Sequence, residues 1–230
     1  MRTEEAIFSA ETFRFFRDLG RNNSKAWMDE NRDRYKQHVV EPFRRLLDVL
    51  APGTQKLHPG FCIGGRTGEN FSRINRDIRF ANDKTPYRAH MYLFLSCAET
   101  PGRAGGQLYV GLSAEAVTIG FRIYYESRQS TMACVCLPRA IENLTWLSRQ
   151  RKKFARKYDN YWYANEKGEW TKYSGWPRDA QEWKRAKGWI VRRKLRPAAA
   201  LRPAFRREIE KTFRELFPLY RFGCLQKWKS

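Results

Sequence analysis

The sequence predicts an α+β fold, with an antiparallel central sheet, N-terminal helices and a basic C-terminal section of helices and a hairpin. Three observations indicate this class. Apolar residues recur at helical spacing in the first 50 residues, strand-like patterns occupy residues 91–125, and helical spacing returns after residue 138. No repeat or long linker divides the 230 residues, so we expect one domain over residues 1–230, with 138–230 as a candidate basic subdomain.

Three helices are expected near the N-terminus. The segment ETFRFFRDL after Ser9 has apolar residues at helical spacing, and Ser9 can cap it. A second amphipathic helix is expected from Lys25 to Val40. Pro42 then begins a third, which runs through Leu50. A loop is expected at Pro52, Gly53, Pro59 and Gly60.

Three segments in the middle of the chain are expected to form an antiparallel sheet. They are MYLFLSCA from Met91, QLYVGLSA from Gln107 and AVTIGFRIYY from Ala116, all rich in aromatic and β-branched residues. The last two are close enough to form a hairpin. The segment CVC, residues 134–136, has a strand-like alternation and is expected to pack inside.

The C-terminal section has both helical and strand patterns. A helix is expected from Pro138 to about Lys157. The segment WYANEKGEWTKYS predicts another hairpin, because Lys167 and Gly168 form a turn signal between aromatic arms. A last helix is expected from Pro203 to Leu216.

Charge is the strongest signal in the composition. The chain has 45 Lys and Arg against 24 Asp and Glu, a formal net charge of +21, and residues 138–230 carry 25 basic and 9 acidic side chains. Such an excess attracts anions, so the expected partner is nucleic acid or another polyanion. The expected nucleic-acid surface consists of Arg151, Lys152, Lys153, Arg156, Lys157, Arg192, Arg193 and Lys194.

Ten aromatic residues between Phe154 and Trp189 are interleaved with cations. Bases can stack on exposed rings while cations follow the backbone, a combination that single strands and RNA use most. Aromatic side chains also fill cores, and we expect about two thirds of these ten to be buried.

The stretch RINRDIRFANDKTPYRAH, from Arg73 to His90, is too polar for an ordinary connector. Its guanidinium groups suit phosphate or carboxylate, and Pro86 stiffens the turn that presents them. The candidate ligand-binding residues are Arg73, Arg76, Arg79, Lys84, Tyr87 and Arg88, and the candidate catalytic residues are Asp77, Asp83, Lys84 and His90.

Two arrangements of this stretch remain open. Its side chains can line a pocket for an anionic ligand, or its arginines and aspartates can pair in a buried network that fixes the loop. No metal or cofactor is assigned, although Asp77 and Asp83 could hold a divalent metal if the protein is an enzyme. His90 would then be the natural acid or base near neutral pH.

Cysteine usage and hydropathy bear on the compartment. The five cysteines are an odd number without a CxxC pair, which indicates neither a disulfide framework nor a zinc ribbon. No apolar run approaches the roughly 20 residues of a membrane-spanning helix. We therefore expect a cytoplasmic protein without a membrane span.

Three blocks of the sequence resemble the domain of unknown function 2461 (DUF2461) family, a group of mainly bacterial proteins. They are NNSKAWMDENRDRYKQHVVEPF from Asn22, the RINRDIRFANDKTPYRAH stretch, and, more weakly, GWPRDAQEW through the Trp189 region, where a turn precedes a helix. The resemblance implies an α+β fold and no particular activity. It also implies a shared polar centre at Arg76, Asp77, Arg79, Phe80, Asp83, Lys84, Thr85, Pro86 and Tyr87.

The favoured function is binding of a polyanion, with single-stranded nucleic acid or RNA preferred, through the basic aromatic-rich C-terminal half and the Arg/Asp/Lys motif. The alternative is an enzyme that acts on a phosphorylated or anionic substrate at RDIRFANDKTPYR. A third explanation is that the motif only stabilises the fold. The charge count favours the first of these functions, and the shared motif favours the second.

Overall fold

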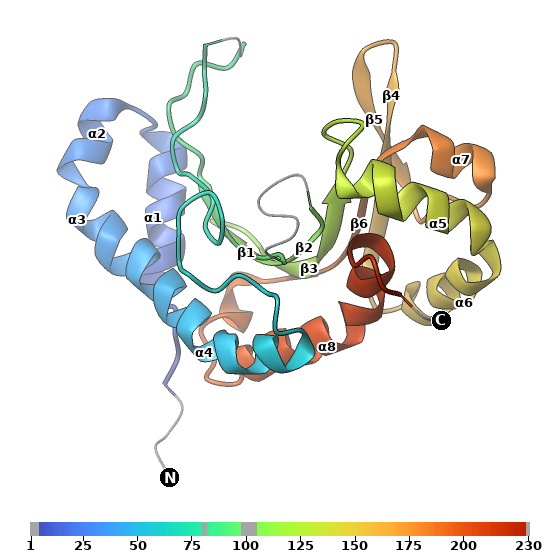
Figure 1. The fold of residues 1–230 in the computed structure, drawn as a ribbon. Helices are drawn as coiled ribbons and strands as arrows, with labels where there is room; N and C mark the ends of the chain where they lie inside the picture. Colours follow the sequence, from blue (N-terminus) through green and yellow to red (C-terminus); the bar gives the residue numbers. More distant parts are fainter. Residues whose placement is uncertain (1–4, 80–81, 98–104, 229–230) are drawn as a thin grey trace.

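Six antiparallel strands form one sheet, against which the helices pack (Figure 1). The computed structural model describes residues 5–79, 82–97 and 105–228. The strand order is β1-β2-β3-β6-β4-β5, so β6 joins the first three strands to the β4–β5 hairpin. The bounds are β1 His90–Leu95, β2 Gln107–Ser113, β3 Val117–Tyr124, β4 Asp159–Glu166, β5 Glu169–Ser174 and β6 Ala186–Leu195.

Helices occupy both ends of the chain and the segment between β3 and β4. The N-terminal ones are α1 Ala10–Arg21, α2 Lys25–Glu30, α3 Arg32–Tyr35, the π-helix η1 Lys36–Val40 and α4 Glu41–Leu57. After β3 come the π-helix η3 Met132–Cys136, α5 Leu137–Glu142 and α6 Leu144–Phe154. The remaining ones are α7 Ala180–Arg185, the 3-10 helix η4 Pro197–Ala199 and α8 Phe205–Cys224.

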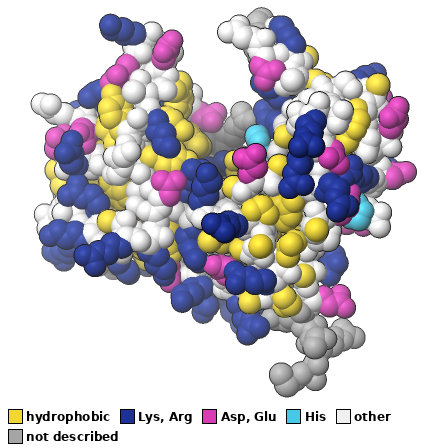
Figure 2. Space-filling model, turned by 180° about the vertical axis from the view of Figure 1, so that it is seen from behind, with side chains coloured by type: hydrophobic (Ala, Val, Ile, Leu, Met, Phe, Trp, Pro, Cys, Tyr) yellow, Lys and Arg dark blue, Asp and Glu magenta, His cyan; other side chains and the backbone are white. Residues whose placement is uncertain are grey.

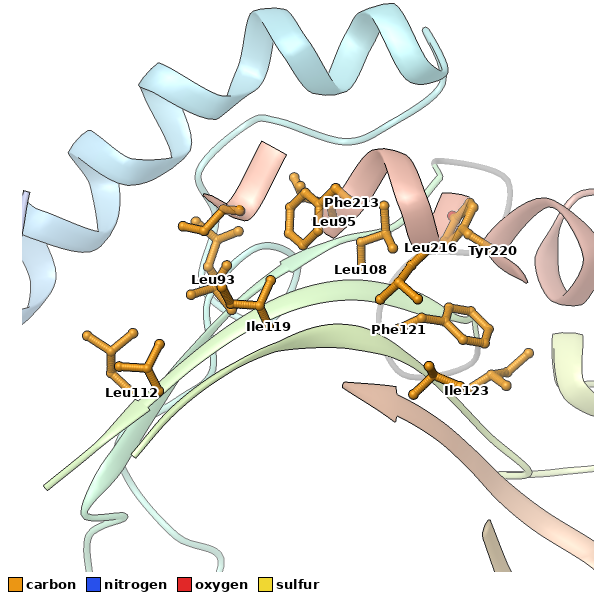
Figure 3. Close-up of a cluster of buried hydrophobic side chains, with 14 of the residues drawn as sticks. Leu93, Leu95, Leu108, Leu112, Ile119, Phe121, Ile123, Phe213, Leu216 and Tyr220 are labelled. Atoms are coloured by element: carbon orange, nitrogen blue, oxygen red, sulfur yellow. The ribbon is translucent and has the colours of Figure 1, made fainter. Parts of the chain in front are cut away.

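Helices cover one face of the sheet, and the core lies there. Alternate strand residues point to that face, among them Leu93, Leu108 and Ile119, which are fully buried. Phe213 and Leu216 of α8 pack against them (Figure 3), and α4 lies alongside α8. Burial of one such side chain contributes about 1.5–3 kcal/mol, so this contact fixes which face of each strand is buried.

The other face of the sheet is open. In Figure 1 the N-terminal helices and an arm, formed by residues 72–79 and 82–89, rise on one side of it, and the β4–β5 hairpin with α5 and α7 rises on the other. The curved sheet therefore lies between these two groups of elements.

The predicted fold class is confirmed. The three central strands form as expected, and β2 and β3 make the expected hairpin. The turn between β4 and β5 also lies where the sequence predicts it: Lys167 and Gly168 have φ of 53° and 91°. Two successive residues with positive φ are what a tight hairpin turn of the preferred hand requires.

Two expectations for the N-terminal helices are wrong. Residues 25–40 form three short segments, α2, α3 and η1, rather than one helix. Pro52 and Gly53 lie inside α4, which continues past Leu50. Pro52 removes the N–H that would bond to the carbonyl of Asp48, but both residues are exposed, so water can satisfy that carbonyl.

The segment CVC is helical and not strand-like. It lies in η3, where Met132 and Cys136, four residues apart, are buried on one side while Cys134 is exposed. A period of two over three residues is too short to distinguish a strand from a helix. The last helix also extends beyond its predicted end at Leu216, to Cys224.

β6 is a strand that the sequence pattern does not predict. Arg192, Arg193 and Lys194 follow one another and obscure the alternation of the strand. The guanidinium of Arg193 lies 2.9 Å from a carboxylate oxygen of Glu208 on the helical side of the sheet. Its neighbours Arg192 and Lys194 belong to the open side, so the charges occupy both faces.

A close approach between β3 and β6 predicts that Gly120→Ala destabilises the protein. A Cβ at Gly120 would lie 2.5 Å from the backbone oxygen of Val191, which cannot move aside. We expect a loss of about 1–3 kcal/mol, as for other overpacked sites, measured by urea unfolding.

Gly20→Ala in α1 is the matched control, because the nearest atom to its added Cβ is 3.8 Å away. Alanine there should be neutral or stabilising by up to about 1 kcal/mol. Equal unfolding midpoints for the two variants would contradict the packing argument.

Candidate functional site

A cleft of about 1210 Å³ lies over the open face of the sheet. Its walls come from the arm (residues 72–79 and 82–89), from strands β1 to β3 with the residues after β3, and from Trp170 of β5. Figure 2 shows the hollow between the two halves of the molecule, with Lys and Arg side chains on both sides. Segments far apart in the sequence therefore meet in one site.

Aromatic rings form the floor of this cleft. The residues of β1 that face it are His90, Tyr92 and Phe94, and the strand register places Tyr109 of β2 opposite Phe94. The rings of Tyr92 and Phe94 are stacked, with centroids 5.9 Å apart. Gly111 lies opposite Tyr92, and a Cβ at Gly111 would collide with the Tyr92 ring. The glycine thus allows the ring to lie flat on the sheet.

Arg122 of β3 lies over these rings. Its guanidinium carbon is 4.5 Å from the ring centre of Phe94 and 4.9 Å from those of Tyr92 and Tyr109. Its Nε donates a hydrogen bond of 2.9 Å to Oε1 of Gln107. Within residues 5–79, 82–97 and 105–228, no carboxylate lies within ion-pair distance of Arg122. The cation is held by rings and by a neutral amide, which leaves its positive charge uncompensated.

A second group of rings lies toward the β4–β5 hairpin. Trp170 is 51% exposed, and its ring lies 5.7 Å from that of Tyr163 and 6.3 Å from that of Tyr124. Next to them, Arg192 lies 4.9 Å from the ring centre of Tyr161, and its Nε donates to Asp159 at 2.9 Å. The open face thus alternates half-exposed rings with cations.

The arm carries most of the predicted motif, and its ion pairs are exposed. Asp83 is 59% exposed and pairs with Arg76, which is 26% exposed, whereas Arg79 and Asp77 form a pair in which both side chains are exposed, 76% and 63%. Lys84 donates to the carbonyl of Ile78 at 3.1 Å. These groups bond to their own neighbours at the surface, so the arrangement is not a buried network.

Hydrogen bonds within the arm also fix the protonation of its acids. The bonds from Arg76 and Thr85 lower the pKa of Asp83 to about 2, and the bonds from Arg79 lower the pKa of Asp77. Both aspartates are therefore ionised at neutral pH. They point to different partners rather than toward one shared metal position.

The other predicted motif residues have separate places. Arg73, Arg76, Asp77, Arg79, Arg88 and His90 line the cleft. Tyr87 is buried, and its backbone bonds to the side chain of Asn23, so it anchors the arm to the helices. Phe80 lies outside the described residues.

His90 lies at the start of β1, with its ring centre 5.1 Å from that of Tyr92. Burial lowers its pKa below the ordinary value, and the positive charges of Arg88, Arg122 and Arg76 lower the pKa further. The imidazole is therefore neutral at pH 7, able to donate from one nitrogen and accept at the other.

The predicted nucleic-acid surface is not one surface. Arg192 and Lys194 belong to the open face of the sheet, whereas Arg193 lies on the helical side. Arg151 lines a different pocket of about 440 Å³, and Lys157 forms an ion pair with Glu215 of α8. Lys152, Lys153 and Arg156 are exposed on α6 and just after it.

The ten aromatics between residues 154 and 189 divide much as expected, because seven are buried and Trp170 is exposed. The sequence did not single out the residues that matter most for the cleft floor. The sequence feature that indicates them is the residue type at alternate positions of the central strands. On the face away from the core, these positions hold aromatic residues and one arginine rather than the small polar residues that are usual there. These residues are Tyr92, Phe94, Gln107, Tyr109, Arg122 and Tyr124.

The chain matches a known protein family. A family described as "Conserved hypothetical protein (DUF2461)" matches residues 11–222. No curated protein matches the chain. In the described part of the chain, no helix is long and apolar enough to span a membrane, and no three His, Cys, Asp or Glu side chains are grouped to hold a metal ion.

The lowered pKa of His90 predicts a contribution to the pH dependence of stability. A histidine in the unfolded chain has a pKa of about 6.5. As the pH falls to and below that value, the unfolded chain binds a proton at His90 more readily than the folded chain does. Stability should therefore fall as pH decreases through this range. We expect the melting temperature to fall less between pH 8 and pH 5 in His90→Gln than in the unsubstituted protein, by roughly the contribution of one titrating group. Identical pH profiles would refute this.

The exposed ion pairs of the arm predict that Asp83→Asn and Lys84→Ala leave the melting temperature nearly unchanged, since surface pairs contribute little to folding. Arg34→Gln is the comparison, because Arg34 bridges two carboxylates that are themselves largely covered, Glu11 at 23% and Asp18 at 31% exposure. Its melting temperature should fall clearly more. A comparable fall in all three variants would mean that the arm is a structural network.

Proposed function

This chain belongs to the DUF2461 family of conserved hypothetical proteins. From the geometry of its site, we propose that it binds single-stranded nucleic acid across the open face of its sheet. The observation that carries the proposal is Arg122, whose guanidinium carbon lies within 4.9 Å of three ring centres in a large cleft and which has no carboxylate partner among the described residues. A strand of DNA or RNA supplies phosphates that can bind the arginine and flat bases that can stack on the rings.

Stacking supports the proposal. Tyr92, Tyr124 and Tyr163 are half-buried, and Trp170 is largely exposed, so each offers ring surface to a ligand. Stacking of one base on an aromatic side chain is worth about 1–3 kcal/mol and depends little on sequence. Bases inside a duplex are already stacked on each other, so this floor favours single strands.

Charge supports it as well. Arg192 lies on the open face, Lys172 lies 4.2 Å from the ring centre of Tyr161, and Arg73 and Arg88 line the cleft. The net charge of +21 adds a long-range attraction for any polyanion. Backbone phosphates would follow these cations while the bases contact the rings.

Enzymatic action on an anionic substrate is the second candidate, and it rests on His90. This is a neutral imidazole in the cleft beside Arg122, a position from which it could transfer a proton. The other candidate catalytic residues, Asp77, Asp83 and Lys84, are engaged with their own neighbours on the exposed arm. We therefore rank binding above catalysis.

The proposal predicts salt-dependent binding of a fluorescent oligonucleotide of about 12 nucleotides, a length within common single-strand site sizes. Fluorescence anisotropy should rise at low salt, and log affinity should fall linearly with log salt, by about 0.7 per phosphate contacted. Trp170→Ala and Tyr124→Leu should each weaken binding by about 1–3 kcal/mol, because each removes a stacking ring.

The control is the double variant Arg17→Gln/Arg45→Gln, which removes two exposed cations outside the cleft. Its affinity should change only slightly. An affinity that does not change with salt, or that is unchanged in both ring variants, would exclude the open face as the interface. If Lys152→Gln/Lys153→Gln weakens binding more than the ring substitutions do, the ligand contacts α6 instead. Cleavage of the oligonucleotide during the assay would favour the enzymatic alternative.

A further inference from the structure

The guanidinium of Arg122 has a fixed orientation in the cleft. One side of the group lies on Phe94 and Tyr92, and its Nε donates to Gln107. The two terminal nitrogens make no hydrogen bond to any described residue. Paired terminal nitrogens held in one plane are the donors that suit two oxygens of a single phosphate or carboxylate.

Further donors lie near Arg122. His90, Arg88 and Arg76 all line the same cleft, and burial, together with the charges of Arg88, Arg122 and Arg76, lowers the pKa of His90. Arg88 is anchored, since its Nη1 donates to two backbone carbonyls of the arm at 3.1 and 2.7 Å. Three guanidinium groups and one neutral imidazole thus line the same cleft.

Negative charge is scarce at this place. Asp77 and Glu126 are acidic residues that line the cleft, and Asp77 is paired with Arg79. Several cations close together repel each other unless an anion lies between them. A bound anion would remove that repulsion, so the local charge favours occupancy by an anion.

A ring adjoins the place where such an anion would lie. Tyr92 is next to both cationic and neutral donors: its ring centre is 4.9 Å from the guanidinium carbon of Arg122 and 5.1 Å from the ring centre of His90. Tyr124, at 5.9 Å from the same guanidinium, is a second ring. An anion with an attached flat group would use both the donors and a ring.

We propose that Arg122, Arg88 and His90 form a discrete phosphate site, and that it takes the phosphate of a nucleotide whose base stacks on Tyr92 or Tyr124. This deepens the proposed function, because a nucleotide within a bound strand has this chemistry. A free nucleoside monophosphate has the same chemistry, and the two sources are separable by experiment.

The test is isothermal titration calorimetry at low salt with three probes: adenosine monophosphate, adenosine and inorganic phosphate. Adenosine monophosphate should bind most tightly, because it alone supplies both the phosphate and the base. Arg122→Gln should weaken its binding by at least about tenfold, the effect of one lost hydrogen bond to a charged group. Arg17→Gln on α1, outside the cleft, should leave its affinity unchanged within about twofold, since an exposed distant charge is screened.

Two further measurements keep the proposal testable if Arg122→Gln folds poorly. Arg88→Gln should also weaken binding of adenosine monophosphate, and Arg122→Lys should restore less than the full affinity because lysine lacks the fork of two nitrogens. Failure of the unsubstituted protein to bind adenosine monophosphate, or equal affinity for adenosine, would overturn the phosphate site.

A measurement with an oligonucleotide separates this inference from strand binding. If adenosine monophosphate displaces a labelled oligonucleotide, a nucleotide of the strand occupies the site. If the oligonucleotide binds equally well to the unsubstituted protein and to Arg122→Gln, while adenosine monophosphate binds to neither, strand binding stands and the phosphate site is wrong. If adenosine monophosphate binds and the oligonucleotide does not, the phosphate site stands and the ligand is a free nucleotide.

Discussion

The constraint on which the rest of the structure depends is the burial of one face of the sheet under α8 and α4. Side chains alternate across a strand, so once Leu93, Leu108 and Ile119 are committed to the core, Tyr92, Tyr109 and Gly120 are committed to the opposite face. A slip of one residue in register would exchange the two sets and place rings and an arginine in the core. The spacing of groups in the cleft is therefore set by apolar contacts on the far side of the sheet.

Arg122 has a double role in this arrangement. Phe94 and Tyr109 belong to the open face, yet they are almost fully buried, because the guanidinium and its alkyl chain cover them. The cation thus shields apolar ring surface from water while its terminal nitrogens still face the cleft. A hydrophobic residue at this position would cover the rings equally well but could not bind an anion, which is why we assign the charge a function beyond packing.

Much of the fold follows from local patterns, whereas the site does not. The central strands and the turn at Lys167 and Gly168 are predictable because turn residues and β-branched runs are local signals. The motif of residues 73–90 was also identified, and several of its residues do line the cleft. Arg122 could not be identified in this way, because its neighbours come from β1 and β2, and only the strand register brings them together. The same limit explains why Arg192 and Arg193, adjacent in sequence, were assigned to one surface but lie on opposite faces.

The position of β6 also has a consequence for how the chain folds. No described hydrogen-bonded pairing joins β3 directly to β4, and β6 makes both connections although it is the last strand in the sequence. During synthesis, the β1–β3 meander and the β4–β5 hairpin would wait, each with an unpaired edge, until residues 186–195 emerge. Such long-range closure slows folding and exposes strand edges to other chains in the interval. The two parts of the open face, on β1–β3 and on β4–β5, would be joined only at that final step, so a truncated chain that ends before β6 would lack the connected face.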